Sequence, residues 1–344
     1  MRDIGARLGV SVATVSLALA GNPRIPEQTR TRIRKTAEAM GYLPDPAVAA
    51  LSRRRRLGRE DSAVSVAFLA ANPVATKLRK GKARPLLQRL HDAVGSACRR
   101  DGFGFETLRC PETPGEMERF RRTARNRNLA GLLVAHPFHL PDRICLPSEL
   151  PTLSLLARHR DISDRPLVTS NYRQSLIETM NRLRQTGYRK PGLFLVSRTF
   201  MYESPRQAPA DQGIWRYLSV FDTFGAVTFP DTKSLPKLLC EDFERPRFLR
   251  WLRRHKPDVI ISTCDRDIPP LLQELRAKTG YCSIDLKDPA SGTLAGLDQQ
   301  RETIAEIAAK FLNSQIFAID SPMANAGLTL EVPARWVEGQ GFGP

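Results

Sequence analysis

Four consecutive arginines, Arg53–Arg56, are the side chains best suited to chemistry in this sequence, and that chemistry is the binding of a polyanion. Nearer the amino terminus, Gly9 begins a run of small and apolar residues. Ser11 in this run is a good N-cap, and the position three residues later is Thr14 rather than an acidic residue. A helix beginning at Ser11 can therefore approach phosphate groups without charge repulsion.

Patterns typical of catalysis or metal binding are missing from the sequence. The six cysteines form no Cys-x-x-Cys pair and no histidine stands at metal-ligand spacing, so we expect reduced, mostly buried thiols. We find no Ser/His/Asp order, P-loop or glycine-rich dinucleotide motif. We therefore expect no enzyme activity, no metal and no cofactor, and an α/β enzyme with an unfamiliar site stays open as an alternative.

Three short helices must position the run that begins at Gly9. Ile4 and Leu8 lie one helical turn apart, and Val10, Val15 and Leu19 continue the inward-facing set. A third helix opens at Pro26-Glu27, and its buried face is expected to carry Ile33, Ala37 and Met40, with Arg30, Arg34 and Lys35 on the other face. A plain three-helix bundle would show the same pattern.

The amino-terminal residues 2–56 resemble the headpiece of the LacI/GalR family of bacterial transcription regulators. The resemblance is carried by Asp3-Ile4-Gly5-Ala6, Gly9-Val10-Ser11-Val12-Ala13-Thr14-Val15-Ser16, Thr29-Arg30 and Met40-Gly41-Tyr42-Leu43-Pro44. It implies a second helix in the major groove and a hinge helix, opening at Asp45-Pro46, that forms when two protomers meet on DNA. Most relatives begin a few residues earlier, so either the first helix frays or the start codon lies upstream of Met1.

The resemblance also implies individual DNA contacts. Val12, Ala13 and Leu17 would face base edges, Ser11, Thr14, Ser16 and Tyr42 would lie at the DNA backbone, and Leu51 would enter the central minor groove. From their charge alone, Arg30, Arg53 and Arg54 are also expected to contact phosphates. Relatives commonly have Arg at the position of Leu17, and a leucine cannot make the bidentate hydrogen bond of an arginine to guanine. We therefore expect specificity to depend on apolar contacts and DNA deformation.

Length and charge agree with a DNA-binding head on a larger body. A chain of 344 residues is long enough for two or three domains. The net charge is +17, and the first 60 residues hold 12 basic and 5 acidic side chains, which makes the head denser in positive charge than the body. A GC-rich genome favours arginine, and that composition would also raise the charge of the body. No signal peptide or membrane-spanning run is apparent, so we expect a cytoplasmic protein.

The body alternates apolar strands with helices, which predicts crossover units and a parallel sheet. Helices are expected near 85–100, 115–126, 172–187, 243–255, 268–280 and 301–314, with strands near 64–69, 103–108, 129–135, 153–156, 167–169, 192–196, 258–262 and 293–297. The resemblance implies more, namely a periplasmic-binding-protein-like core of two parallel-sheet subdomains. It is carried by Gly187-Tyr188-Arg189-Lys190, the stretch 256–262, Ala295-Gly296-Leu297-Asp298-Gln299 and Arg335-Trp336-Val337-Glu338-Gly339.

These assignments give a domain layout. We expect a helix-turn-helix domain over 1–44, a hinge helix and linker over 45–61, and an effector-binding and dimerisation core over 62–344. The two subdomains of the core are expected to comprise 62–170 plus 298–325, and 171–297 plus 326–344.

A ligand cleft in such a core would lie at the carboxyl ends of its strands. Asn72, Asp265 and Asp298 each follow an expected strand, and Arg206 stands in the region where sugar-binding relatives carry an arginine. Each of the three strand-end residues could instead be a helix N-cap. The chain has Cys264-Asp265 where relatives often have Asn-Asp, so a hexose site of the usual kind is doubtful.

The sequence thus favours a homodimeric, sequence-specific repressor that binds a pseudo-palindromic operator. A small effector, such as a carbohydrate or related metabolite, would act between the subdomains. An effector-independent regulator that uses the core only for dimerisation is the alternative.

Overall fold

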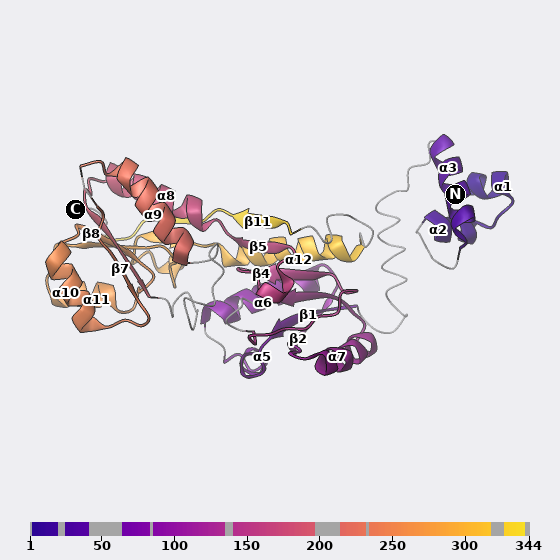
Figure 1. The fold of residues 1–344 in the computed structure, drawn as a ribbon, viewed down its shortest axis with the longest axis horizontal. Coiled ribbons are helices and arrows are strands. Elements are labelled where there is room, and N and C mark those ends of the chain that lie inside the picture. Colours follow the sequence, from indigo (N-terminus) through magenta and orange to yellow (C-terminus); the bar gives the residue numbers. More distant parts are fainter. Residues whose placement is uncertain are drawn as a thin grey trace. The chain divides into compact units, whose positions relative to one another are not determined.

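The structure is a computed structural model, and it describes residues 2–19, 25–40, 64–82, 85–134, 140–196, 214–231, 234–317 and 327–340. The chain divides into two compact units, Met1–Glu60 and Asp61–Pro344 (Figure 1). Each unit has its own hydrophobic core. The amino-terminal unit is helical and the second is built from two sheets with helices on both faces, as the sequence predicted.

The described residues of the amino-terminal unit form the helices α1 (Arg2–Leu8), α2 (Val12–Leu19) and α3 (Glu27–Ala39). Their core contains Ile4, Val15 and Ile33, which are almost completely buried, and Leu8, Val10 and Leu19 pack against it. This confirms the inward-facing set. Met40 is the exception, because it is 37% exposed rather than buried. It lies in the turn after α3, where the helical spacing that would direct it inward no longer applies.

The first sheet of the core is entirely parallel, with the strand order β11-β5-β4-β3-β1-β2. Every residue of β1 and β3 is buried, because helices cover both faces of the sheet. Helices α6 and α12 pack side by side on one face, and α5 and α7 lie against the other (Figure 1). The strands are β1 (Ser65–Ala70), β2 (Gly104–Arg109), β3 (Leu129–Val134), β4 (Thr152–Leu155), β5 (Leu167–Ser170) and β11 (Thr329–Val332), and the helices α5 (Asn72–Arg79), α6 (Pro85–Arg100), α7 (Pro114–Asn126) and α12 (Arg301–Phe317).

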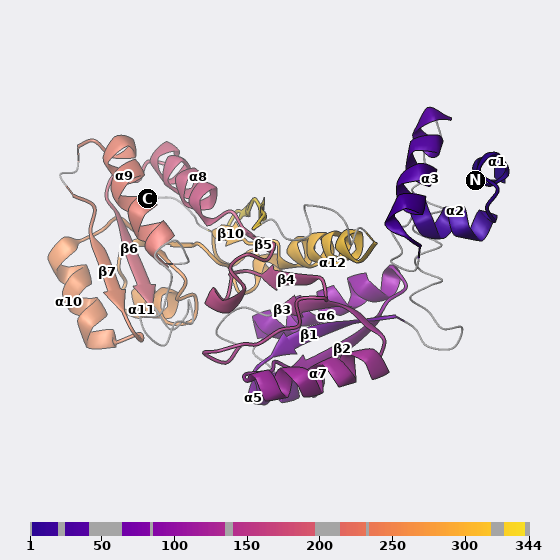
Figure 2. The ribbon, with the colours of Figure 1, turned by 45° about the vertical axis from the view of Figure 1, so that its right-hand side comes forward.

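The second sheet has the order β12-β10-β9-β8-β6-β7 and is parallel except for the pair β10/β12. Alternate residues of β6 enter two separate cores: Leu193 and Leu195 pack with residues of α8 and α9, and Phe194 and Val196 with residues of α10 and α11. The two pairs of helices are seen in Figure 2. The strands are β6 (Pro191–Val196), β7 (Lys237–Cys240), β8 (Val259–Ser262), β9 (Gly280–Ser283), β10 (Gly296–Asp298) and β12 (Arg335–Val337), and the helices α8 (Tyr172–Gln185), α9 (Ile214–Thr228), α10 (Arg245–His255) and α11 (Ile268–Glu274).

The chain passes between the two sheets three times: after β5, between β10 and α12, and between β11 and β12. The third passage differs from the expected boundary, which assigned all of 326–344 to the second subdomain. β11 pairs with β5 in the first sheet, and only β12 joins the second. The two strands are four and three residues long, too short for a hydrophobic pattern to reveal which sheet each one enters.

One local expectation was wrong. The helix expected over 268–280 ends at Glu274, because Arg276 adopts a left-handed backbone conformation with φ of 49°, and Gly280 then begins the unexpected strand β9. Asn72 follows β1, as expected, and is the first residue of α5, with Pro73 in the first turn of that helix.

Candidate functional sites

A glycine turn and a side-chain cap define the start of α2. Gly9 has a φ of 66°, a conformation that glycine adopts without strain. The Ser11 hydroxyl accepts a hydrogen bond from the Thr14 backbone N–H at 3.0 Å and lies 2.8 Å from the Thr14 hydroxyl. Ser11 is thus the N-cap that the sequence predicted. The cap orients the first turn of α2 and leaves that turn without a negative charge.

The outward face of α2 carries small, uncharged side chains. Val12 is 45% exposed although it is apolar, and Ala13 is also exposed. Thr14 and Leu17 are half-buried, whereas Val15 and Ala18 enter the core. Val12 is not part of the core of the head, and its exposed surface is available to contact another molecule.

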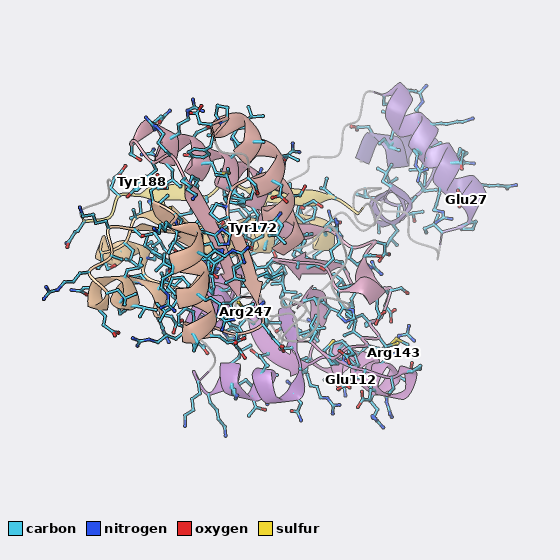
Figure 3. All side chains as sticks on the ribbon, turned by 60° about the vertical axis from the view of Figure 1, so that its left-hand side comes forward. Glu27, Glu112, Arg143, Tyr172, Tyr188 and Arg247 are labelled. Atoms are coloured by element: carbon cyan, nitrogen blue, oxygen red, sulfur yellow. The ribbon has the colours of Figure 1, made fainter. Side chains whose placement is uncertain are left out.

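Helix α3 presents basic side chains, but not all of them are available. Arg34 and Lys35 are exposed. Arg30 forms an ion pair with Glu27, the first residue of α3 (Figure 3). Arg32 donates a hydrogen bond to the Leu8 carbonyl at 3.0 Å and so fixes the end of α1 to α3, a role that the sequence pattern did not indicate.

Several predicted DNA contacts cannot be placed. Tyr42, Leu51, Arg53 and Arg54 lie outside the described residues, as does the side chain of Ser16. Their roles stay predictions.

Asp265 lies just beyond β8, at the carboxyl ends of the parallel strands of the second sheet. Its carboxylate accepts hydrogen bonds from the Tyr281 hydroxyl at 2.8 Å and from the Lys287 backbone N–H at 3.1 Å. Burial raises the pKa of Asp265, and hydrogen bonds from Ser283 and Tyr281 oppose that rise. The residue is therefore integrated into a local network rather than acting as a simple helix cap.

Asp285 follows β9, the strand next to β8, and was missed because β9 itself was missed. Arg301 contacts both of its oxygens: Nη1 lies 2.8 Å from Oδ1, and Nη2 donates to Oδ2 at 2.9 Å. The Lys287 ammonium donates to Oδ2 at 3.2 Å. Burial raises the pKa of the Asp285 carboxyl, but Arg301 and Lys287 outweigh burial and lower it from 3.8 to about 2. Asp285 is therefore a carboxylate at neutral pH.

Lys287 connects the two aspartates, because its backbone bonds to Asp265 and its side chain to Asp285. We call Asp265, Tyr281, Asp285, Lys287 and Arg301 the strand-end cluster. It lies where parallel sheets usually bind ligands.

The other predicted effector residues, Asp298, Asn72 and Arg206, are not part of the strand-end cluster as defined here. The Asp298 carboxylate accepts a hydrogen bond from the Gln300 backbone N–H at 2.9 Å and pairs with Arg335 at 3.0 Å. Within the described part of the chain, Asn72 is exposed and makes no hydrogen bond or ion pair to the cluster. Arg206 lies outside the described residues.

No group of three or more histidine, cysteine or acidic side chains among the described residues could hold a metal ion. All six cysteines are free thiols; Cys145 is half-buried and the others are buried. Burial raises the pKa of Cys98 to about 12, so that thiol stays protonated. Across the same residues, none of the helices combines the length and the hydropathy that a membrane span requires.

Comparison with known proteins identifies the amino-terminal unit. The family model described as "Bacterial regulatory proteins, lacI family" matches residues 1–45. The HTH-type transcriptional repressor CytR of Escherichia coli (strain K12) is 44% identical over 46 residues, which are 13% of this chain and 14% of that repressor. The chain thus matches only the head of this curated relative.

Solved structures extend the similarity in fold to the core. The Lac repressor dimer, bound to operator and the anti-inducer ONPF, aligns with a TM-score of 0.54 and 11% identity over 98% of this chain and 96% of that one. The Cra regulator from Pseudomonas putida, in complex with fructose 1-phosphate, aligns with a TM-score of 0.53 and 14% identity over 80% of this chain and 98% of that one. Residues 1–45 thus match the LacI family model, and the core shares its fold with these solved regulators.

Proposed function

We propose that the protein is a transcriptional repressor that binds a pseudo-palindromic operator as a homodimer, with α2 of each protomer in the major groove. The observation that carries this proposal is the outward face of α2, in which an exposed valine and alanine follow a capped helix start, within the segment that matches the family model. The Lac repressor neighbour was solved as a dimer on its operator, which supports the same assembly here.

The chemistry of this face determines how sequence is read. Val12, Ala13 and Leu17 offer methyl groups for contact with thymine methyls but no hydrogen-bond donor for guanine. Ser11, Thr14, Ser16, Tyr42 and the arginines would serve the phosphate backbone, which fixes register without reading sequence. Base-edge hydrogen bonds are then few, so part of the specificity must come from the energy needed to deform the operator.

Regulation would act through the hinge residues. Leu51 of two protomers is expected to open the central minor groove, and unstacking a base step costs on the order of a few kcal/mol. Allosteric coupling between a ligand and a second site is usually about 1–3 kcal/mol. The two free energies are comparable. A ligand that changes the conformation of the core could therefore decide whether Leu51 is inserted into the minor groove.

The strand-end cluster is our candidate effector site, at the position where an α/β core binds ligands. The Cra neighbour was solved with a phosphorylated sugar, which supports a metabolite-sized ligand in this kind of core. A soluble sensor of metabolites acting on DNA would work in the cytoplasm.

A second candidate is a regulator that needs no effector. It is favoured by the pairing of Asp285 with Arg301 and Lys287, which gives both cations an anionic partner without any ligand. Thermal-shift screening with sugars, nucleosides and sugar phosphates separates the two candidates, because only an effector-responsive core is stabilised.

The DNA-binding proposal is tested by selecting bound sequences from a random duplex pool and then measuring binding to the selected site. We expect Val12→Asp to weaken that binding about tenfold or more, because a carboxylate would face base edges and phosphates. Val227→Asp is the matched control, since Val227 on α9 is 72% exposed in the other unit. Circular dichroism verifies that both variants fold; equal binding by both would contradict the proposed role of α2.

A further inference from the structure

The ion pair between Asp285 and Arg301 joins the two subdomains. Asp285 follows β9 of the second sheet, whereas Arg301 begins α12, which packs on the first sheet beside α6. The same helix is held to α6 by the pair Arg89–Glu302 at 2.7 Å. Gly131 of β3 lies so close to Leu312 that an added Cβ would be 3.2 Å from its methyl groups. Arg301 therefore belongs to a helix that is packed on the first subdomain.

We infer that Arg301 is an oxyanion receptor which Asp285 occupies while no ligand is bound, and that the effector carries a carboxylate or phosphate group that takes its place. The inference rests on the proposed function, because it names the ligand class of the candidate effector site. Replacing an internal carboxylate on Arg301 by an external one would disconnect the two subdomains at this point, which gives the ligand a means of changing their relative position.

The energetics favour an oxyanion over a neutral ligand. Removing one partner from a buried ion pair leaves an unpaired charge and is strongly destabilising, and sugar hydroxyls would not neutralise the guanidinium. A planar guanidinium with several N–H donors matches carboxylate and phosphate oxygens in geometry as well as charge. An entering oxyanion therefore preserves the pairing of Arg301, whereas a neutral sugar does not.

The released aspartate also keeps a partner. The Lys287 ammonium already contacts Asp285 Oδ2 at 3.2 Å, so that carboxylate stays paired after Arg301 turns to a ligand. The exchange thus leaves neither Asp285 nor Arg301 without a counter-charge. Before the exchange, Arg301 and Lys287 share the carboxylate of Asp285. After it, Lys287 would hold Asp285 and Arg301 would hold the oxyanion of the ligand.

The pair is accessible and incompletely satisfied. The side chains of Arg301, Asp285 and Lys287 are 13%, 17% and 29% exposed, so none is sealed from solvent. Asp285 Oδ1 is buried and lies near Arg301 Nη1, yet it accepts no well-aligned hydrogen bond among the described residues. A ligand oxygen with better alignment can therefore compete for the guanidinium.

The test uses the full-length protein, with ribose 5-phosphate and ribose as probes at constant ionic strength, and measures thermal shift and titration calorimetry. We expect ribose 5-phosphate to bind and stabilise the wild type, and ribose to do neither. Arg301→Met should abolish the response. Asp285→Asn should lower the apparent Kd about tenfold or more, because Asp285 no longer competes with the ligand for Arg301. Arg245→Met, which removes the exposed pair with Glu274, should respond like the wild type.

Inorganic phosphate and citrate extend the test to other oxyanions. If Asp285→Asn fails to fold, Arg301→Lys replaces it: this variant keeps the charge but loses the planar fork, and its affinity for the probes should fall. The inference is overturned if no oxyanion binds wild type or variants, if ribose acts as well as its phosphate, or if Arg301→Met keeps the response. Operator binding is measured in parallel: its presence with no oxyanion response refutes only this inference, whereas its absence in the wild type refutes the proposed function.

Discussion

At the scale of single residues, the charge of Asp285 decides what the strand-end cluster does. A buried carboxylate is tolerated only when cations compensate for its lost hydration, and Arg301 and Lys287 supply that compensation. The pKa of Asp285 is consequently lowered to about 2 even though burial acts in the opposite direction. A group of this kind makes the stability of the core dependent on acidity.

The sign of this dependence follows from the lowered pKa. The carboxylate is favoured in the folded state, so its contribution is complete above the unfolded value of 3.8 and is lost as the pH falls through about 2. The shift corresponds to about 2 kcal/mol. We predict that Asp285→Asn lowers the free energy of unfolding by about that amount at about pH 6, and that the difference from the wild type shrinks at about pH 2.5.

Urea unfolding at the two acidities measures this difference. Glu306→Gln removes the exposed pair with Arg100 and serves as the control, for which we expect little change at either pH. A difference between wild type and Asp285→Asn that stays constant as the pH falls would show that packing, rather than charge, explains the effect of the substitution.

At the scale of secondary-structure elements, the cap of α2 stabilises the helix start that is proposed to approach DNA. Substituting an N-cap serine by alanine costs about 1 kcal/mol, whereas aspartate is as good a cap. We predict that Ser11→Ala destabilises the head by about 1 kcal/mol, and that Ser11→Asp keeps its stability but weakens DNA binding, because its carboxylate would face phosphates.

Thr113 provides the matched control, since it caps α7 by accepting a hydrogen bond from the Glu116 backbone N–H at 3.2 Å. Thr113→Asp should leave both stability and DNA binding nearly unchanged. Thermal unfolding and mobility shift with the selected operator measure the two quantities separately. If Ser11→Asp binds DNA as well as the wild type, the first turn of α2 does not approach the phosphate backbone.

The same scale explains what the sequence could and could not predict. Helices such as α6 and α7 were placed within a residue or two because an apolar stripe of helical period runs through them. β9, β11 and β12 have three or four residues each, and such segments are defined by their pairing partners, not by their own pattern. Because β9 was missed, Asp285 was missed as well. The sequence placed Asp265 at a strand end but did not predict that Arg301 pairs with Asp285.

At the scale of the whole molecule, the proposed function combines a positive charge with a dimer. The net charge of +17 would attract any duplex and carries no sequence information. In the proposed complex, selectivity would then come from the requirement that two α2 helices reach two half-sites at once. Because each head reads only a few apolar contacts, neither head alone should bind specifically.

This requirement predicts a strict dependence on half-site spacing. Half-sites read by the two heads lie on one side of the duplex, about 10 base pairs apart or a multiple of that. We predict that inserting about 5 base pairs, half a helical turn, at the centre of the selected operator reduces binding to the level of nonspecific duplex, because the second half-site is turned to the opposite side. Mobility shift over a series of spacers measures this. Undiminished binding to the half-turn insertion would mean that the two heads bind independently. Leu51 of two protomers would then not meet at a central minor groove.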